Sequence, residues 1–317
     1  MSIHLSGSVA YDRIMTFPGH FEDHLLPEKL HSLNVCFLID HIEEKRGGTA
    51  GNIAYTLALL KEKPCIYTCV GRDFTGYDRA LEALGISLAG IRRLEESLTA
   101  CAYIITDKKG NQITGFSPAA MNTPCDPALY PKCAAGDWAL VGPGNVEDMR
   151  ALPALYRDTR TPYIFDPGQQ VPALTPEALL EGFSGAALLI GNDYEIELIG
   201  TMTGLTRAQM LERVGCLITT LGGEGSEVAR RDWDAPRRIA PISVPRVADP
   251  TGAGDSYRGG LLKALHAGLD METAARMGTV CASFCVEQYG TQEHSFSRES
   301  FVKRYEAAFG PFPALSW

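Results

Sequence analysis

Near its carboxyl end the chain carries the sequence Asp249-Pro250-Thr251-Gly252-Ala253-Gly254-Asp255-Ser256, followed by a stretch with helical apolar spacing. Two glycines with a small residue between them let successive backbone N–H groups turn toward one point. The helix that begins here directs the positive end of its dipole to the same point. Gly252, Ala253 and Gly254 therefore predict an anion-binding hole between a strand and a long helix.

Asp255 stands at the rim of this predicted hole. A carboxylate does not suit a site built for negative charge unless it serves as a base. It could take the proton from an attacking hydroxyl while the backbone amides stabilise a transferring phosphoryl group. Aspartate is also a favoured helix N-cap residue, so on the sequence alone that capping role stays open.

Two other phosphate-binding patterns fail in this sequence. The chain has no G-x4-G-K-[ST] segment, which excludes the ordinary P-loop nucleotide-binding class. Tyr257 stands where a dinucleotide fingerprint would need its third glycine, so a nicotinamide-dependent oxidoreductase is disfavoured as well.

A second glycine-rich turn, Gly47-Gly48-Thr49-Ala50-Gly51-Asn52, opens another segment with helical spacing. The helix start and the Asn52 side chain could hydrogen-bond a polyhydroxyl substrate. Asp12, just past the first expected strand, could accept from two neighbouring hydroxyls. Close helix packing explains the glycines equally well, and a turn or a cap explains Asp12.

Strands and helices alternate along most of the chain. Apolar strands are expected at residues 3–9, 66–70, 139–141, 163–165, 187–190 and 216–221. Helices are expected at 77–84, from 146, near 194, and from 253, 271 and 298. This alternation predicts an α/β fold with a mostly parallel central sheet covered by helices on both faces.

Residues 98–106 and 112–116 interrupt the alternation and flank a turn rich in Asp, Gly and Asn. Together with residues 33–39 they predict a small β-sheet outside the main one. Such a sheet would form a lid over the strand ends.

Composition narrows the class of protein. The 317 residues carry 29 lysines and arginines against 38 aspartates and glutamates, a net charge of −9, which argues against a nucleic-acid partner. No apolar run approaches the roughly 20 residues of a membrane span. The nine cysteines are an odd number, and no leader is expected before Gly7. We therefore expect a reduced, cytoplasmic chain without a disulfide framework or a membrane partner.

These residues together resemble the ribokinase-like (PfkB) family of sugar and nucleoside kinases. The family pattern D-T-x-G-A-G-D is matched at residues 249–255, with Pro250 in place of the usual Thr. Asn192-Asp193-Tyr194-Glu195 is similar to the N-x-x-E element, and residues 220–225 are similar to T-x-G-x-x-G. With the Gly47–Asn52 turn, four patterns in family order span nearly the whole chain.

The opening of the chain is also similar to that of bacterial adenosine kinases. The similarity rests on residues 6–12, 17–19, 25–27, 46–48, 192–195 and 290–293. It implies phosphoryl transfer from ATP to a nucleoside 5′-hydroxyl, with adenosine the favoured acceptor. A broader purine nucleoside kinase for inosine or guanosine, a sugar kinase of the family, and a catalytically idle nucleotide-binding module remain alternatives.

The resemblance implies a role for each matching residue. Asp255 would be the general base and the Gly252, Ala253 and Gly254 amides the anion hole. The nucleoside would be bound by Ser8, Asp12, Gly48, Asn52 and Phe116. ATP would lie along Asn192, Thr220, Gly222 and Gly225. Glu195 would act on Mg²⁺, through water, and Asp249 and Thr251 would lie where some family members bind a monovalent cation such as K⁺.

The resemblance also implies a discontinuous domain organisation. Residues 13–45 and 97–116 would form the β lid, and residues 1–12, 46–96 and 117–317 the α/β kinase core. The exposed edges of lid strands could pair two subunits, so a homodimer through the lid is one expectation.

The nucleobase pocket is expected between Phe116, which would stack on the base, and a second wall. Ala102 is small for that wall, and Tyr103 would point to the opposite face of its strand. Phe37 is a candidate replacement. Gln169 and Gln170 are further substrate-side candidates, unless they belong to an ordinary polar loop.

Overall fold

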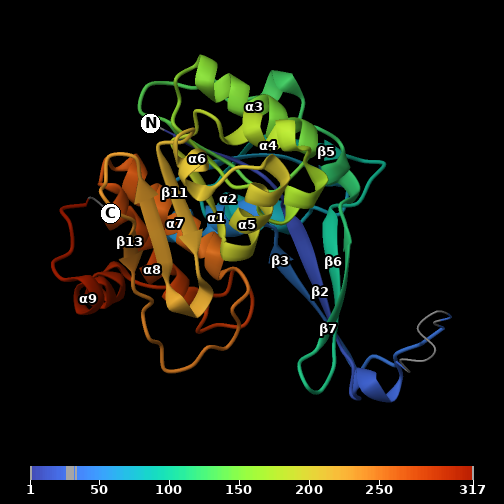
Figure 1. Ribbon diagram of the computed structural model, residues 1–317. Helices are drawn as coiled ribbons and strands as arrows, with labels where there is room; N and C mark the ends of the chain where they lie inside the picture. The colour runs from blue at the N-terminus through green and yellow to red at the C-terminus, as the bar shows by residue number, and fades with distance from the viewer. Residues whose placement is uncertain (1, 26–31, 33, 316–317) are drawn as a thin grey trace.

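The computed structural model describes residues 2–25, 32 and 34–315 (Figure 1). Its larger sheet has the strand order β13-β12-β11-β10-β9-β8-β1-β4-β5. The bounds are β1 Ile3–Ser6, β4 Cys65–Gly71, β5 Ser87–Leu94, β8 Trp138–Val141, β9 Tyr163–Phe165, β10 Leu188–Asn192, β11 Cys216–Thr220, β12 Ser226–Arg230 and β13 Arg237–Ile239. Neighbouring strands from β5 to β11 pair in parallel, and β12 and β13 add an antiparallel edge. The predicted mostly parallel sheet is confirmed.

Helices pack on both faces of this sheet (Figure 1). They are α1 Thr49–Leu59, α2 Tyr77–Ala83, α3 Val146–Asp158, α4 Pro176–Phe183, α5 Asp193–Thr203, α6 Arg207–Leu211, α7 Ala253–His266, α8 Met271–Cys285 and α9 Arg298–Phe309. The central strands alternate between two cores: Leu140 packs with α1, α2, α7 and α8, whereas Ala139 and Val141 pack with α3 to α6. Strands buried on both faces are typical of parallel sheets.

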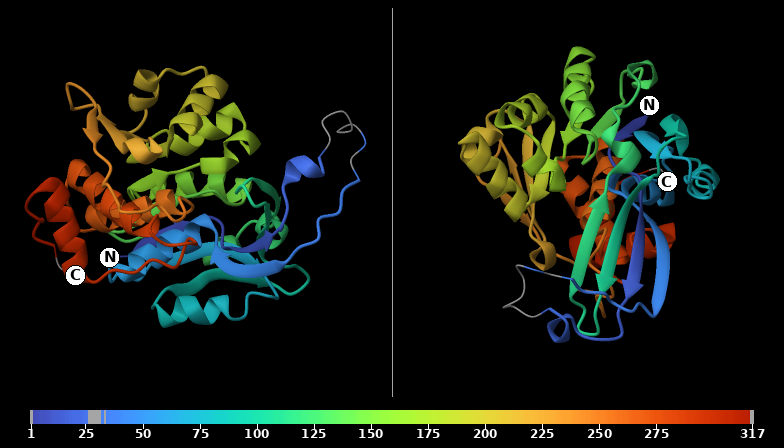
Figure 2. Two further views of the ribbon diagram at one scale, coloured as in Figure 1. Left: turned by 90° about the horizontal axis from the view of Figure 1, so that it is seen from below. Right: turned by 90° about the vertical axis from the view of Figure 1, so that its right-hand side faces the viewer.

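A smaller sheet lies beside the core and extends away from the helices (Figure 2). Its order is β3-β2-β6-β7, with β2 Ala10–Thr16, β3 His41–Gly47, β6 Ala100–Thr106 and β7 Gln112–Ser117. Asp12 pairs with Lys45 and Ala102, and Ala102 pairs with Phe116, so these four side chains share one face. The fold is therefore an α/β core with a separate, smaller sheet at the place expected for the lid.

The expected strand at residues 33–39 is wrong for the residues that the structure describes. Residues 34–39 form no strand, and residue 33 lies outside the described part of the chain. Phe37 instead packs its ring 4.9 Å from Phe17 and 5.2 Å from Phe21, in an aromatic cluster at one end of the lid. The strands that complete the lid sheet are β2 and β3.

The expected first strand also differs from the structure. It divides into β1 and β2, with Gly7 between them in a backbone conformation (φ 149°) that favours glycine. One continuous apolar pattern therefore supplies a strand to each sheet. The lid boundary expected after Asp12 falls inside β2, and the one expected before Arg46 falls inside β3.

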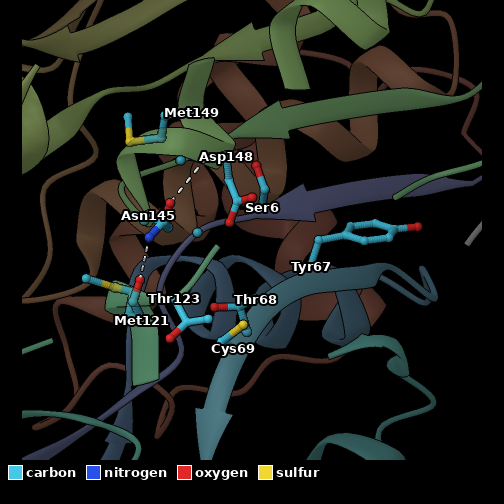
Figure 3. A pocket seen from close by; sticks show the side chains of 12 residues that line it. Ser6, Tyr67, Thr68, Cys69, Met121, Thr123, Asn145, Asp148 and Met149 are labelled. Atoms are coloured by element: carbon cyan, nitrogen blue, oxygen red, sulfur yellow. Dashed lines mark hydrogen bonds between the residues drawn. The ribbon is translucent and has the colours of Figure 1, made fainter. Parts of the chain in front are cut away.

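The structure has a small cavity beside two strands of the larger sheet. A cavity of about 10 Å³ beside β1 and β4, lined by Ser6, Thr68, Asn145 and Asp148, has the space of a single water molecule (Figure 3). This cavity is too small for a sugar or a nucleotide.

No helix in the described part of the chain combines the length and apolar character that a bilayer span requires.

Candidate active site

A cavity of about 890 Å³ lies at the carboxyl ends of β10 and β11 and at the amino end of α7. Ligands of open α/β sheets bind at this edge because loops and helix amino ends converge there. The cavity is lined by predicted residues from three separate patterns, namely Asn192, Glu195, Thr220, Gly222, Gly225, Gly252, Ala253, Gly254 and Asp255. The fold thus brings together residues that lie far apart in the sequence.

The amino end of α7 has the geometry of an anion-binding turn. Gly252 precedes the helix in the left-handed region (φ 79°), and a Cβ there would lie 2.9 Å from the Cβ of Thr291. Ala253 N–H donates to the Pro250 carbonyl at 3.3 Å. The next N–H groups, of Gly254 and Asp255, belong to the first turn, where a helix provides no acceptor of its own.

The Asp255 carboxyl lies in the first turn of α7 and lines the cavity. Its Oδ2 accepts a hydrogen bond from Asn52 Nδ2 at 2.8 Å. Burial raises the pKa of Asp255 to about 7, although the Asn52 bond and the Arg258 guanidinium act in the opposite direction. A carboxyl group with this pKa can both accept and release a proton near neutral pH.

Asp12 lies in the lid sheet, on the same face as Ala102 and Phe116. Gly47 stands beside it, and a Cβ at Gly47 would come within 2.4 Å of the Asp12 carboxylate. Burial, with the negative charge of Asp249, raises the pKa of Asp12 to about 6. The negative charge of Asp12 in the lid sheet also contributes to the raised pKa of Asp255 in α7.

Three residues that were expected to bind the nucleoside make close contacts with other residues of the protein. The Ser8 hydroxyl is buried and accepts the Thr49 N–H at 2.9 Å, at the start of α1. Gly48 is the N-cap of α1 (φ 87°), and a Cβ there would lie 2.6 Å from the Ala10 nitrogen. Asn52 is buried against Asp255. Thr49, which we did not predict, lines the cavity instead of Ser8.

The residues expected along ATP line this cavity. Asn192 and Glu195 form a capping box at the start of α5: each backbone N–H donates to the other's side chain at 2.8 Å. Burial raises the pKa of Glu195. Gly225 (φ 89°) is required by its turn, because a Cβ would meet the Ile239 carbonyl at 2.1 Å.

Sequence reasoning missed a buried ion pair in the cavity wall. Arg258 of α7 donates from Nη2 to Asp166 Oδ1 at 2.6 Å, and its Nη1 donates to the Gly254 carbonyl at 3.0 Å. Both side chains of the pair are almost completely buried. The i+3 spacing from Asp255 puts Arg258 on the same helix face and was the available signal. Asp166 lies 92 residues away, and no spacing rule connects it.

A second cavity, of about 460 Å³, lies under the lid strand β7. It is lined by Phe116, which is 51% exposed, and by Asn122, Asn145 and Gln170. Gln170 donates to the Gly144 carbonyl at 2.8 Å, so its side chain is a structural link at the cavity wall. Phe37, a candidate for the second wall, is packed in the aromatic cluster with Phe17 and Phe21.

Asp249, the first residue of the anion-hole pattern, accepts two backbone hydrogen bonds. Asp249 Oδ1 accepts the Thr251 N–H at 2.9 Å, and Oδ2 accepts the Gly290 N–H at 3.1 Å. These bonds connect the turn before α7 to residues 290–293 after α8. No group of three or more His, Cys, Asp or Glu able to hold a metal occurs among the described residues.

Known proteins are similar to this chain in both sequence and fold. The family model for pfkB family carbohydrate kinases matches residues 8–297. A nucleoside kinase of Methanocaldococcus jannaschii is 34% identical over 282 residues, which are 88% of this chain and 91% of that protein. A Burkholderia thailandensis nucleoside kinase solved in complex with inosine is 34% identical, with a TM-score of 0.85 over 98% of this chain and 99% of that chain. Another structure of the same enzyme contains ADP and inosine, at 35% identity and a TM-score of 0.83 over 98% of this chain and 97% of that chain. With a match that spans most of its length, this chain belongs to the pfkB family of carbohydrate kinases and is a phosphotransferase that acts on a hydroxyl group.

Proposed function

We propose that this protein is an ATP-dependent nucleoside kinase that phosphorylates the 5′-hydroxyl of purine nucleosides. The observation that carries the proposal is the Asp255 carboxyl at the mouth of an anion-binding turn in the larger cavity, with a second, smaller cavity against the exposed Phe116 ring of the lid. Adenosine is the acceptor favoured by the sequence resemblance. The inosine found in the Burkholderia thailandensis nucleoside kinase supports extending the proposal to inosine and guanosine.

In the proposed reaction, Asp255 accepts the proton of the acceptor hydroxyl as that oxygen attacks the γ-phosphorus of ATP. The bond from this phosphorus to the β–γ bridging oxygen breaks, and ADP leaves. The Gly252–Gly254 turn and the positive end of α7 stabilise the negative charge on the transferring group. Phosphoryl transfer needs positioning and charge neutralisation more than covalent help, and the cavity supplies both.

The two ends of the acceptor have different proposed partners. Asp12 is partly accessible on the face of the lid sheet that includes Phe116, and it would accept hydrogen bonds from ribose hydroxyls. Gly48, Ser8 and Asn52 act mainly by shaping the start of α1 and by holding Asp255. The nucleobase would lie in the smaller cavity against Phe116.

Asn192, Thr220, Gly222 and Gly225 would border the ATP. Glu195 fits an indirect role toward Mg²⁺, because its carboxylate lines the cavity while one oxygen is held by the Asn192 N–H. A hydrated Mg²⁺ carried by the phosphates needs few protein ligands. When bound, it would supply additional neutralisation of phosphate charge. Asp249 and Thr251 remain our proposed neighbours of a K⁺ ion.

We also retain the proposed division into a core of residues 1–12, 46–96 and 117–317 and a lid of residues 13–45 and 97–116. The strand β2 begins before residue 13 and β3 ends after residue 45. A homodimer through the lid edges is a further proposal. Sedimentation at several protein concentrations would test it.

The raised pKa of Asp255 predicts how turnover depends on pH. The base must be ionised to accept a proton, so activity is lost as the pH falls through the pKa of about 7. On the acid side, log kcat/KM should fall by about one unit per pH unit and level off above neutrality. Initial rates between pH 5 and 9 measure this. A profile that stays flat down to pH 5 would contradict it.

Replacing Phe116 by alanine tests the nucleobase contact. We expect Phe116→Ala to weaken nucleoside binding by about 1–3 kcal/mol, the range for base–aromatic stacking. The control is Ile113→Ala, since Ile113 is also exposed on β7 but pairs with Ile105 on the opposite face. Isothermal titration with inosine and adenosine compares the two. Equal affinities in both variants would place the base elsewhere.

Product analysis tests the proposed reaction itself. ³¹P NMR of a reaction with ATP and inosine should show a nucleoside 5′-monophosphate and ADP in equal amounts. The 5′-deoxy nucleoside, which lacks the acceptor oxygen, should bind competitively and give no product. A 2′- or 3′-phosphate product would refute the proposed orientation, and absence of product with every purine nucleoside would refute the proposed function.

A further inference from the structure

Gln292, in the loop after α8, reaches the candidate base through Asn52. Its side chain is buried, with Nε2 2.9 Å from Asn52 Oδ1 and 2.6 Å from the Tyr77 hydroxyl. An amide NH₂ has two N–H groups, and these two contacts use both of them. The Gln292 amide is therefore fixed with its nitrogen toward α1 and α2.

This orientation of Gln292 determines the orientation of Asn52. A side-chain amide has one accepting oxygen and one donating nitrogen. Because the Asn52 oxygen is taken by Gln292, its nitrogen faces the other way and donates to Asp255 Oδ2 at 2.8 Å. An ionised carboxylate only accepts hydrogen bonds, so a reversed Asn52 would set oxygen against oxygen.

A second branch runs from Gln292 to the lid. The Tyr77 hydroxyl accepts from Gln292 and donates to the Gly47 carbonyl at 2.9 Å, and Gly47 is the last residue of β3. Tyr77 is buried, with its ring 5.7 Å from that of Tyr11 in β2. A Cβ at Gly51 would lie 2.2 Å from the Tyr77 hydroxyl, so the glycine there leaves room for this branch.

We propose that Gln292 is a positioning residue for phosphoryl transfer: it orients Asn52 to hold the base Asp255 and connects that base, through Tyr77, to the end of lid strand β3. The inference rests on the proposed function, because it takes Asp255 as the base. Hydrogen bonds inside a partly dehydrated site reinforce one another when each donor direction is fixed by the next. In this network of hydrogen bonds, the two N–H groups of Gln292 determine which atoms of Asn52 and Tyr77 donate and which accept.

The test compares Gln292→Met, which has similar volume and no donor, with the control Glu293→Gln at the exposed neighbouring position. Carboxyl ¹³C NMR titration reports on Asp255 directly, with its resonance assigned by loss of the signal in Asp255→Asn. We expect the pKa of Asp255 to rise by about one unit in Gln292→Met, because a hydrogen bond to its charged form is lost. The pKa should not change in Glu293→Gln.

Kinetics give the second readout. At pH 7, kcat should fall by about 10- to 100-fold in Gln292→Met, by analogy with residues that orient metal ligands through a hydrogen bond. The KM for ATP should stay within about twofold, since neither Gln292 nor Asn52 lines the larger cavity proposed for ATP, and the deficit in kcat should narrow as the pH rises. Glu293→Gln should match the wild type in both constants.

Tyr77→Phe keeps the ring and removes the acceptor of one Gln292 N–H, so it should shift the Asp255 titration in the same direction by a smaller amount. It decides the question if Gln292→Met shows no cooperative unfolding transition. An Asp255 titration identical to the wild type, in folded Gln292→Met or otherwise in Tyr77→Phe, would overturn the inference.

The NMR readout separates this inference from the proposed function. Nucleoside turnover in the wild type with an unshifted Asp255 titration in Gln292→Met would refute the positioning role alone. The expected shift without turnover of any nucleoside would refute the acceptor class and support the role of Gln292 in orienting the carboxyl group.

Discussion

Asp255→Asn should reduce kcat for a nucleoside acceptor by about 10²–10⁴-fold, the contribution typical of a positioned general base. The amide is isosteric with the carboxyl group but cannot take the hydroxyl proton. Binding should change little, because the Gly252–Gly254 turn and the cavity walls remain. The loss should therefore appear in kcat, with the affinity for nucleoside and ADP within about threefold of the wild type.

Single-turnover kinetics with titration calorimetry separates these two quantities. Asp193→Asn is a suitable control, because Asp193 is an acidic residue at the start of α5 that is not among those lining the cavity. Near-normal turnover in Asp255→Asn would remove Asp255 from the role of base. A loss of binding equal to the loss of turnover would make it a binding residue.

Arg258→Met should destabilise the fold more than any surface ion-pair variant. The substitution leaves the Asp166 carboxylate buried without its partner, which costs about 3–5 kcal/mol. It also removes the donor to the Gly254 carbonyl and a positive charge that lowers the pKa of Asp255. Turnover at pH 7 should therefore fall even in the fraction that is folded.

Urea unfolding measures the first effect, and a pH profile of kcat measures the second. Asp166→Asn combined with Arg258→Met removes both charges and should recover much of the lost stability. Arg230→Met is the matched control: Arg230 bonds the exposed Asp232 at 2.7 Å, and such surface pairs contribute about 0–1 kcal/mol. Equal destabilisation in both arginine variants would contradict the importance of the buried pair.

The parallel core could be predicted from the sequence because its signals are local. The segment after Gly252 has helical spacing, and the structure has α7 from Ala253 to His266. Short apolar runs such as residues 139–141 and 163–165 are too short for helices, and the alternation with helices identified them as parallel strands. For the same reason the glycine turn at the start of α7 could be located from the sequence.

The lid was predicted less well because one apolar segment leads into strands of both sheets. Residues 3–9 looked like one strand, but a turn at Gly7 sends the chain from β1 into β2. The apolar residues of the segment around Phe37 suggested a strand, yet Phe37 packs against Phe17 and Phe21. A run of apolar residues indicates that their side chains are buried, but it does not indicate which residues they pack against.

Long-range polar contacts were beyond prediction from a single sequence. Arg258 and Asp166 come from different motifs, and neither residue type at its own position indicates the other. Gln292 was noticed only as part of a family pattern. Its contacts with Asn52 and Tyr77 join segments more than 200 residues apart. Such pairs exist only once the strand order has brought α1, α2 and the loop after α8 together.

We have proposed that this kinase acts on purine nucleosides. A coupled ADP-release assay with Mg·ATP tests it most directly, with adenosine, inosine, guanosine, cytidine, ribose and fructose as acceptors, each with and without K⁺. We expect turnover with the purine nucleosides and little or none with ribose and fructose. Turnover with a free sugar alone would contradict this proposal, and so would the absence of turnover with every acceptor.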